Sequence, residues 1–414
     1  MHPFSIIFLV FLGAMTITQL WLATRQIRHV SALRGEVPPA FADKVTLQQH
    51  HKAADYTVAG TRLGIVDTVL DAVWLLVLTL GGVIGLIDQY WRGLELPWLT
   101  TGIAVVLSVF LLSWLVSLPL SVYKTFGLEA RFEFNRTTPA LFVADALKGL
   151  LIGAILGAPL LAAIIWLMQN AGELWWLYAW GVWAGFSLLL FWAYPAFIAP
   201  LFNKFSALKD ETLRGRIEAL LKRCGFKSNG IFVMDGSKRS AHGNAYFTGL
   251  GNNKRIVFFD TLMESLEGDE IEAVLAHELG HFRMHHIRKR MLVSFAMALA
   301  GLALLGWLSA QSWFYAALGV DTPSVWIALL LFVLVTPVFT FPLTPLTSLW
   351  SRRHEFEADE YAAEQSDANQ LAHALVKLYQ DNATTLTPDP VHSRFYDSHP
   401  PAPVRIARLR QLTA

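Results

Sequence analysis

The sequence predicts a mainly α protein in which a seven-transmembrane-helix bundle carries a small α+β domain outside the lipid. Three observations support this fold class. The 414-residue chain is 54% hydrophobic and only 16% charged, whereas a soluble domain carries about a quarter charged residues. Seven stretches are apolar over the roughly 20 residues that a transmembrane helix needs. Two other regions are polar and combine helix-like with strand-like patterns.

The seven predicted spans occur in both halves of the chain. Asp67 and Asp71 interrupt the start of the second span, so its beginning is the least sharply defined. No basic segment precedes the first span and no small-residue cleavage site follows it, so we expect a retained anchor and not a signal peptide. The predicted spans are Phe4–Ala23, Val66–Ile87, Leu99–Tyr123, Gly149–Asn170, Leu174–Ile198, Met291–Ser309 and Val325–Trp350.

Lysine and arginine are distributed unevenly among the loops. The segments after the first, third, fifth and seventh spans are basic, whereas the alternate loops carry one arginine between them. Because positive loops stay in the cytosol, the N-terminus should lie outside and both polar regions in the cytosol. Over the whole chain, 33 Lys and Arg nearly balance 32 Asp and Glu, which gives no reason to expect nucleic acid as a partner.

Apolar and polar segments divide the chain into four parts. Residues 1–202 form an N-terminal membrane region with five spans, and residues 203–290 form the core of the polar domain. Residues 291–350 hold the sixth and seventh spans, and residues 351–414 form a C-terminal polar region. The single cysteine, Cys224, can form neither an internal disulfide nor a thiolate metal site. We interpret it as a packing residue near a helix end.

Both polar regions contain recognisable elements. Short runs of β-branched and aromatic residues between glycine and asparagine predict strands, and Gly251–Asn253 predicts a turn between the last two. The helix after these strands should begin at Asp269, with Glu272 in capping-box position. A short basic helix should end the chain. The other predicted elements are the helices Lys209–Cys224, Glu270–His286, Glu355–Glu364 and Asn369–Tyr379, the strands Gly230–Gly236, Asn244–Gly249 and Lys254–Asp260, and the loop Pro388–Pro403.

The segment His277-Glu278-Leu279-Gly280-His281 has the H-E-x-x-H pattern of a zinc site on a helix. Residues i and i+4 share one helical face, so both imidazoles can reach one tetrahedral Zn²⁺ at about 2.0–2.1 Å. Glu278 would flank the metal, take a proton from zinc-activated water and pass it to the leaving amine. A chance match on a surface helix is the alternative, but the capped helix and the preceding strands favour a zinc metallopeptidase with one Zn²⁺ per chain.

A catalytic zinc needs a third protein ligand and one open position. Glu355 and Asp359 share a helix face, whereas Glu357 points elsewhere. One of the two can bind zinc while the other orients a ligating histidine, and spacing alone does not decide between them. Without the H-E-x-x-H histidines, this segment would indicate only a solvated acidic helix face. We interpret His285 and His286 as a polar helix end, because a third helical turn reaches past a single metal.

With both motifs in hand, the chain resembles the Ste24 family of CAAX prenyl proteases, membrane zinc metallopeptidases of the M48 group. The matching blocks keep the family's order over about the last half of the chain, whereas the first half matches only by span count and length. Smaller heat-shock M48 proteases share both zinc motifs but fit the length and the seven spans less well. The blocks are Pro200–Asn203, Asn244–Phe247, Lys254–Val257, Phe259–Leu262, Glu355–Asp359, and His399-Pro400-Pro401 with Arg405.

The resemblance implies roles for individual residues. It makes Glu355 the third zinc ligand and leaves Asp359 to support a ligating histidine. It also implies that Asn244, Ala245 and Tyr246 lie on an edge strand that pairs with the substrate backbone, a mode that needs few side-chain contacts. His399 would help to hold the tetrahedral intermediate, and Arg405 would support the site. From the sequence alone, His399 would be a turn residue before two prolines.

The resemblance further implies that the seven helices enclose a chamber, with the metallopeptidase domain on the cytosolic side. Substrates would be peptides or proteins, prenylated or membrane-associated, and the lipid bilayer is the other expected partner. The short C-terminal tail lacks a lysine-based retention signal, so we expect a prokaryotic inner membrane, where general membrane-protein quality control is the alternative role.

A metal or solute transporter is the competing class of function. It would be expected to carry ionisable residues deep in several spans, and the later spans have none. A scaffold with weak proteolytic activity is a third possibility, which the intact H-E-x-x-H motif disfavours.

Overall fold

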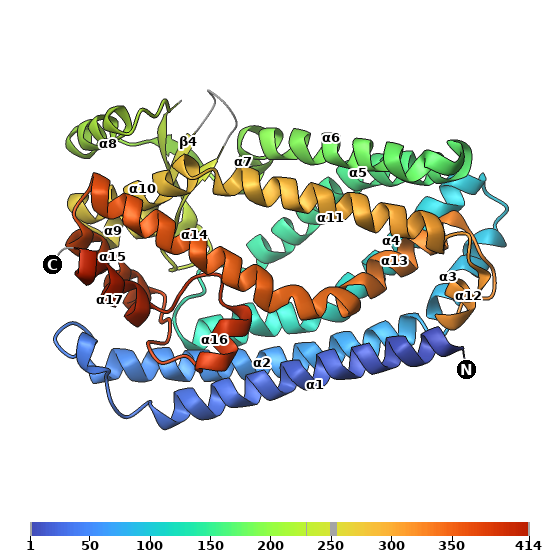
Figure 1. Ribbon diagram of the computed structural model, residues 1–414, viewed down its shortest axis with the longest axis horizontal. Coiled ribbons are helices and arrows are strands. Elements are labelled where there is room, and N and C mark those ends of the chain that lie inside the picture. The colour runs from blue at the N-terminus through green and yellow to red at the C-terminus, as the bar shows by residue number, and fades with distance from the viewer. Residues whose placement is uncertain (1, 229, 249–254, 413–414) are drawn as a thin grey trace.

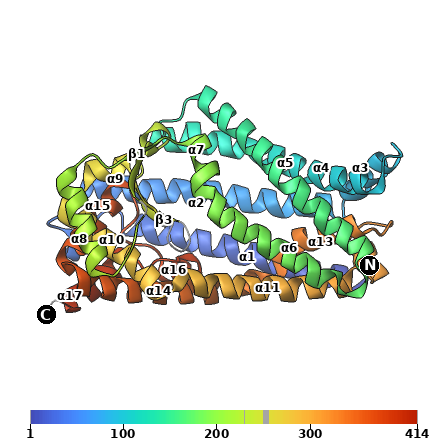
Figure 2. The same ribbon diagram turned by 90° about the horizontal axis from the view of Figure 1, so that it is seen from above.

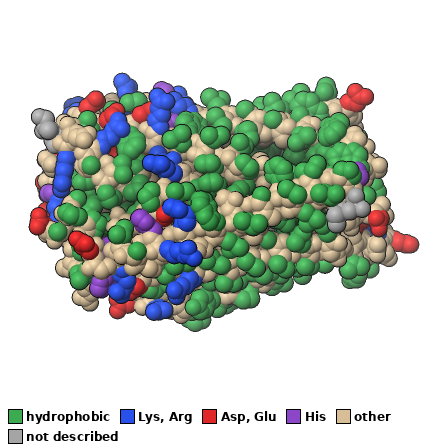
Figure 3. Space-filling view, turned by 60° about the horizontal axis from the view of Figure 1, so that its bottom comes forward, with side chains coloured by type: hydrophobic (Ala, Val, Ile, Leu, Met, Phe, Trp, Pro, Cys, Tyr) green, Lys and Arg blue, Asp and Glu red, His purple; other side chains and the backbone are tan. Residues whose placement is uncertain are grey.

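The computed structural model describes residues 2–228, 230–248 and 255–412. Long helices run side by side along most of the molecule, and the elements of the polar domain gather at one end together with the C-terminus (Figure 1). The N-terminus lies at the other end. Hydrophobic side chains cover most of the helical part, whereas Lys and Arg gather at the end that carries the polar domain (Figure 3). This distribution is the one expected of a membrane-embedded bundle with one polar end.

The described residues contain six helices that are long and apolar enough to cross a membrane, and seven if one bent pair counts as a span. The second predicted span, Val66–Ile87, was wrong as a single helix. The structure has two helices there, α2 and α3, which meet at an angle of 48°. Gly82 begins α3 with a left-handed backbone (φ 77°), a conformation that suits glycine. The helices in this region are α1 (Pro3–Ala32), α2 (Leu47–Leu78), α3 (Val83–Arg92), α4 (Trp98–Tyr123), α5 (Pro139–Asn170), α6 (Trp175–Ala193), α7 (Ala199–Phe202), α11 (His286–Leu308), α12 (Ser312–Ala317) and α13 (Val325–Thr340).

The spans surround an interior that side chains do not fill. In the most apolar part of α5, only 6% of the residues are buried. In the corresponding part of the helix that runs from α13 to Gln365, 44% are buried. A helix of a close-packed bundle buries one face against its neighbours, so the small buried share of α5 agrees with an open space beside it. From above, α4 and α5 lie on one side of the bundle and α11 and α14 on the other (Figure 2). The seven-helix bundle with a chamber is thus confirmed.

A four-stranded sheet forms the base of the polar domain. Its order is β1-β2-β4-β3, with β2 and β4 parallel and the outer pairs antiparallel. The three predicted strands are present, and the turn predicted at Gly251–Asn253 lies outside the described residues. The fourth strand, β1, is only three residues long, too short for a sequence pattern. The strands are β1 (Phe205–Ala207), β2 (Ile231–Met234), β3 (Ala245–Thr248) and β4 (Arg255–Phe259).

Helices cover this sheet and bury an apolar core that includes Ile217, Phe258 and Leu375. Cys224 caps α8 and packs against the same core, as predicted. The loop predicted at Pro388–Pro403 contains an additional helix, α16, which the proline at its first position favours. The helices are α8 (Glu211–Arg223), α9 (Asp260–Ser265), α10 (Gly268–Arg283), α14 (Thr344–Gln365), α15 (Ala368–Asp381), α16 (Pro390–Tyr396) and α17 (Ala402–Leu412).

The helix that carries the H-E-x-x-H motif differs from its prediction at both ends. Its capping box uses Glu267 and Glu270, so the predicted pair Asp269 and Glu272 was wrong by two residues. The helix ends at Arg283, because His285 has a left-handed backbone (φ 58°) and starts a new helix, α11, at His286. The motif therefore lies about one turn before the point where α10 ends and the membrane helix α11 begins.

Candidate metal centre

Close packing of α10 against α14 brings the two sequence motifs together. Gly280 lies within the H-E-x-x-H motif and faces Ala358 on α14. A Cβ atom at Gly280 would lie 2.9 Å from the Cα atom of Ala358 and 3.0 Å from its carbonyl oxygen. These distances are shorter than any ordinary contact, so the approach requires glycine. At this separation His277 and His281 on α10 reach the side chain of Glu355 on α14.

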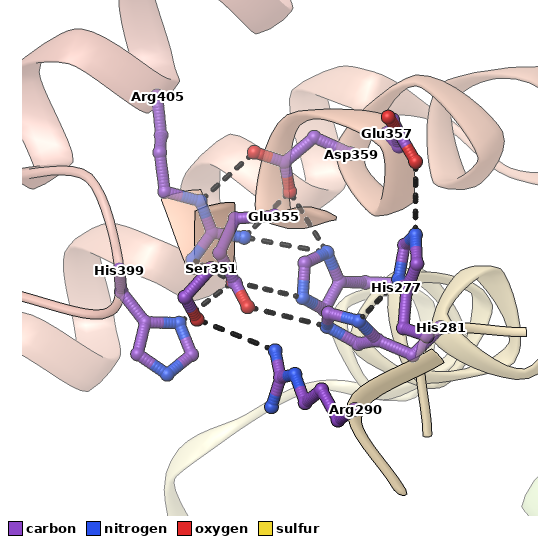
Figure 4. A network of polar contacts seen from close by, with 10 residues as sticks. His277, His281, Arg290, Ser351, Glu355, Glu357, Asp359, His399 and Arg405 are labelled. Carbon is purple, nitrogen blue, oxygen red and sulfur yellow. Dashed lines mark hydrogen bonds and ion pairs between the residues drawn. The ribbon is translucent and has the colours of Figure 1, made fainter. Parts of the chain in front are cut away.

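The donor atoms of these three residues converge (Figure 4). Nε2 of His277 is 3.4 Å from Oε2 of Glu355, and Nε2 of His281 is 3.3 Å from Oε1. A tetrahedral zinc ion with bonds of about 2.0–2.1 Å separates its ligand atoms by about 3.3 Å. The three side chains therefore fit one zinc ion as they stand. Glu355 is only 1% exposed, so its charge needs partners inside the protein.

Asp359 and Arg405 hold His277 from the other side. Nδ1 of His277 is 2.8 Å from Oδ1 of Asp359, so a proton on Nδ1 leaves Nε2 free for the metal. Arg405 donates from Nε to Oδ2 of Asp359 at 2.8 Å and from Nη2 to Oδ1 at 2.5 Å. Burial lowers the pKa of His277, but its hydrogen bonds to Asp359 and Glu355 outweigh burial and raise that pKa to about 9 in the metal-free protein.

His281 has a comparable support that the sequence analysis missed. Its Nδ1 is 2.9 Å from Nδ1 of His286, whose Nε2 is 2.9 Å from Oε2 of Glu357. If Nε2 of His281 binds zinc, its proton lies on Nδ1 and is donated to His286, which then donates from Nε2 to Glu357. Arg353 donates to the second oxygen of Glu357 at 3.3 Å. The interpretation of His286 as a polar helix end was wrong. The left-handed backbone of His285 turns the chain, and the side chain of His286 is buried, with 1% of it exposed.

A second group of potential metal ligands lies beside these hydrogen bonds. His286, His354 and Glu357 have donor atoms within 4.8 Å of one another, and the rings of the two histidines stack at 3.9 Å. In this stacked geometry no metal ion can lie in both ring planes. His286 therefore supports His281 by its hydrogen bond, and His354 packs against the ring of His286.

A cavity of about 260 Å³ opens beside the metal ligands. Glu278 lines it and is partly exposed, so its carboxylate is accessible from the cavity. Asn244 and Ala245 line it from the end of the sheet, and Arg405 lines it from α17. His399 also faces this cavity, with Nδ1 2.6 Å from Oε2 of Glu355. The structure thus gathers residues from five separate segments around one small space.

Tyr246 is the exception among the predicted site residues. It lines a different cavity of about 420 Å³ together with Asn203 and Arg255, because successive residues of a strand point to opposite faces. Burial raises the pKa of its hydroxyl to about 12, so the group stays protonated. The strand that carries it, β3, lies at the edge of the described sheet, with one side unpaired by the other described strands.

Two histidines and a glutamate placed to hold zinc, a neighbouring glutamate in the same cavity and a bundle of membrane helices define a membrane zinc metalloprotease. Comparison with known proteins agrees. Residues 26–204 match the model for the CAAX prenyl protease N-terminal region with five membrane helices, and residues 207–413 match peptidase family M48. The chain belongs to the M48 family, within its Ste24/CAAX prenyl protease 1 group, and the transporter alternative is set aside.

Individual relatives resemble the chain over most of its length. CAAX prenyl protease 1 of Saccharomyces cerevisiae is 34% identical over 426 residues, covering 94% of this chain and 91% of the relative. A homolog from Arabidopsis thaliana is 39% identical over 305 residues, covering 72% of this chain and 70% of the relative. The crystal structure of S. mikatae Ste24p superimposes with a TM-score of 0.91 at 31% identity and covers 99% of both chains.

Proposed function

We propose that the chain hydrolyses peptide bonds at the centre formed by His277, His281 and Glu355, with Glu278 as general base. The observation that carries this proposal is the separation of the donor atoms, 3.3 and 3.4 Å, which equals the edge of a zinc tetrahedron. Bound zinc would supply a Lewis acid that polarises the peptide carbonyl and activates water.

The side chains around the ligands would divide the remaining work. Glu278 takes the proton of the attacking water and returns it to the leaving amine. Asp359, held by Arg405, keeps His277 in the tautomer that presents Nε2 to the metal. His399, on the exposed side of Glu355, is placed to donate to the oxyanion of the tetrahedral intermediate. The edge strand at Asn244, Ala245 and Tyr246 would align an extended peptide by backbone hydrogen bonds.

We further propose a prenylated, membrane-associated peptide or protein as substrate, with the site on the cytosolic side and the N-terminus outside. The names of the relatives, CAAX prenyl proteases, support this substrate class, and the basic loops support the orientation. General membrane-protein quality control without prenyl specificity is the alternative. These relatives are eukaryotic and give no support to a prokaryotic inner membrane.

Cleavage of a panel of quenched peptides, with and without farnesyl-cysteine, tests the proposal. Purified zinc-loaded protein should cleave, Glu278→Gln should bind zinc and not cleave, and Glu264→Gln should behave like the wild type because Glu264 is exposed on α9. Preference for farnesylated peptides supports CAAX-type specificity, and equal cleavage of plain peptides favours quality control. An active, zinc-loaded Glu278→Gln variant would rule out the assigned general base.

A further inference from the structure

A second, polar cavity lies among the helices beside the catalytic one. It measures about 610 Å³ and is bordered by α2, α4 and the π-helix η2 (Lys124–Glu129). Of its polar side chains, Asp67, Ser117 and Ser121 lie within the predicted spans, where such groups are costly unless they face water or a polar ligand. This lining therefore indicates a cavity that receives a polar molecule. It includes Thr57, Thr61, Asp67, Ser117, Ser121 and Lys124.

Asn382 lies between this cavity and the catalytic one, since it lines both. Its Oδ1 accepts a hydrogen bond from the backbone N–H of Gly243 at 3.1 Å and lies 3.2 Å from Nδ1 of His242. Gly243 directly precedes Asn244, the first residue assigned to the substrate-binding strand. The next residue in the chain, Ala383, has a left-handed backbone (φ 44°) and lines the polar cavity. Such a conformation is unfavourable for alanine and persists where the surrounding structure enforces it.

The direction of the edge strand relates the two cavities to a bound peptide. A peptide that pairs with β3 in the more stable antiparallel direction has its N-terminal part beside Phe247 and Tyr246. Its C-terminal part then passes Ala245 and Asn244 and continues towards Gly243 and the polar cavity. The segment released by cleavage at the metal centre would thus point towards this cavity.

We infer that the polar cavity binds the C-terminal segment of the peptide substrate and that Lys124 pairs with its terminal carboxylate; this inference rests on the proposed peptidase function. The cavity extends along α2 from Tyr56 to Asp67, about 16 Å at 1.5 Å per residue. Three extended residues need about 10 Å, so a short C-terminal segment fits.

The charges in the cavity favour this assignment. Among the residues that the structure describes, no acidic side chain forms an ion pair with the exposed Lys124. Glu129 is already engaged, since Tyr56 donates to its Oε1 at 2.7 Å and its Oε2 lies 3.5 Å from Nε2 of His242. Asp67 lies deep along α2, whereas Lys124 lies at the end of α4 nearest the polar domain. A carboxylate bound at the end of the cavity nearest the polar domain therefore meets Lys124 and not Asp67.

Two quenched peptides that differ only in a terminal carboxylate or a terminal amide test the inference. Wild-type protein should cleave the carboxylate peptide with kcat/KM about tenfold higher, the lower range for a hydrogen bond to a charged group, through a lower KM. Lys124→Gln should cleave the two peptides with similar kcat/KM, and Lys124→Arg should restore the preference. Lys209→Gln, at an exposed lysine between β1 and α8, should keep the wild-type ratio.

The possible outcomes separate this inference from the proposed function. Equal kcat/KM for both peptides in the wild type, or a preference that survives Lys124→Gln, overturns the carboxylate subsite and leaves the peptidase intact. Absence of zinc-dependent cleavage of either peptide overturns the peptidase itself. Gly64→Phe supplies an independent measurement if Lys124→Gln does not fold, because a Cβ at Gly64 meets no atom within 4 Å. Filling the cavity there should impair peptides with three residues after the cleaved bond more than peptides with one.

Discussion

Replacing Gly280 by alanine should weaken the metal centre without changing any ligand. A Cβ atom at this position would lie 2.9 Å from Cα and 3.2 Å from Cβ of Ala358, whereas carbon atoms in contact prefer about 3.5–4.0 Å. The helices α10 and α14 must therefore separate by about 0.6 Å. The donor atoms of Glu355 and His281, now 3.3 Å apart, would separate with them.

A zinc site tolerates deviations of about 0.2 Å from its ideal bond lengths, so this shift takes Glu355 out of range. We expect zinc affinity to fall by about 10–100-fold, the usual effect of losing ligand orientation. Overpacking should cost about 1–3 kcal/mol of unfolding free energy, offset by about 1 kcal/mol because alanine is the better helix former. The zinc site should therefore suffer more than the fold.

Competition with a fluorescent chelator would measure zinc affinity, and thermal unfolding with and without zinc would measure stability. Gly215→Ala is the matched control, because Gly215 lies exposed within α8 and its Cβ would meet no atom within 4 Å. That variant should keep its zinc affinity and gain about 1 kcal/mol. A Gly280→Ala protein that binds zinc within twofold of the wild type would refute the argument that this contact sets the ligand spacing.

Three further predictions concern the support of the ligands. Because the pKa of His277 lies near 9 in the metal-free protein, zinc must displace a proton at neutral pH. Zinc affinity should therefore rise about tenfold per pH unit up to about pH 9 and level off above it, and metal-free stability should fall between pH 6.5 and 9 as that proton is lost. Arg405→Ala leaves the carboxylate of Asp359 buried without its cation and should cost about 3–5 kcal/mol in denaturant unfolding. Glu357→Ala removes the end of the hydrogen-bond chain to His281 and should weaken zinc binding by about tenfold or more in chelator competition.

Each of these predictions has a contrary result. Zinc affinity that is flat between pH 6.5 and 9 would contradict the raised pKa of His277. An Arg405→Ala protein as stable as the wild type would show that the pair with Asp359 is dispensable. For Glu357→Ala, the control is Glu364→Ala, an exposed glutamate on the same helix. Equal zinc affinity of these two variants would mean that the hydrogen bonds from Glu357 through His286 to His281 have no effect on zinc binding.

The sequence predicted the fold where periodicity or length was strong. Apolar stretches located the spans, and short runs of β-branched and aromatic residues located β2, β3 and β4. The prediction failed where a few backbone angles decide the course of the chain. The break at Gly82 and the left-handed His285 each divide a helix, and neither changes the hydrophobic pattern on which the prediction depended.

Within the site, residues four apart on one helix could be predicted, because helical geometry places them on the same face. His277 with His281, and Glu355 with Asp359, belong to this class. Contacts between segments could not be predicted, since spacing left Glu355 and Asp359 equivalent until the resemblance distinguished them. Arg405 and His399 likewise came from the resemblance, and the structure brings both to the ligands.

His286 shows why membrane and polar segments should not be interpreted separately. It is the first residue of the membrane helix α11, yet its imidazole lies against His281, one of the proposed zinc ligands. Glu355 likewise stands on α14, which continues from the last span. The ligands and their supports are therefore fixed by the ends of two membrane helices as well as by the polar domain. A displacement of either helix would move His281 relative to Glu355, so the membrane bundle holds the metal centre in its working geometry in addition to enclosing the chamber.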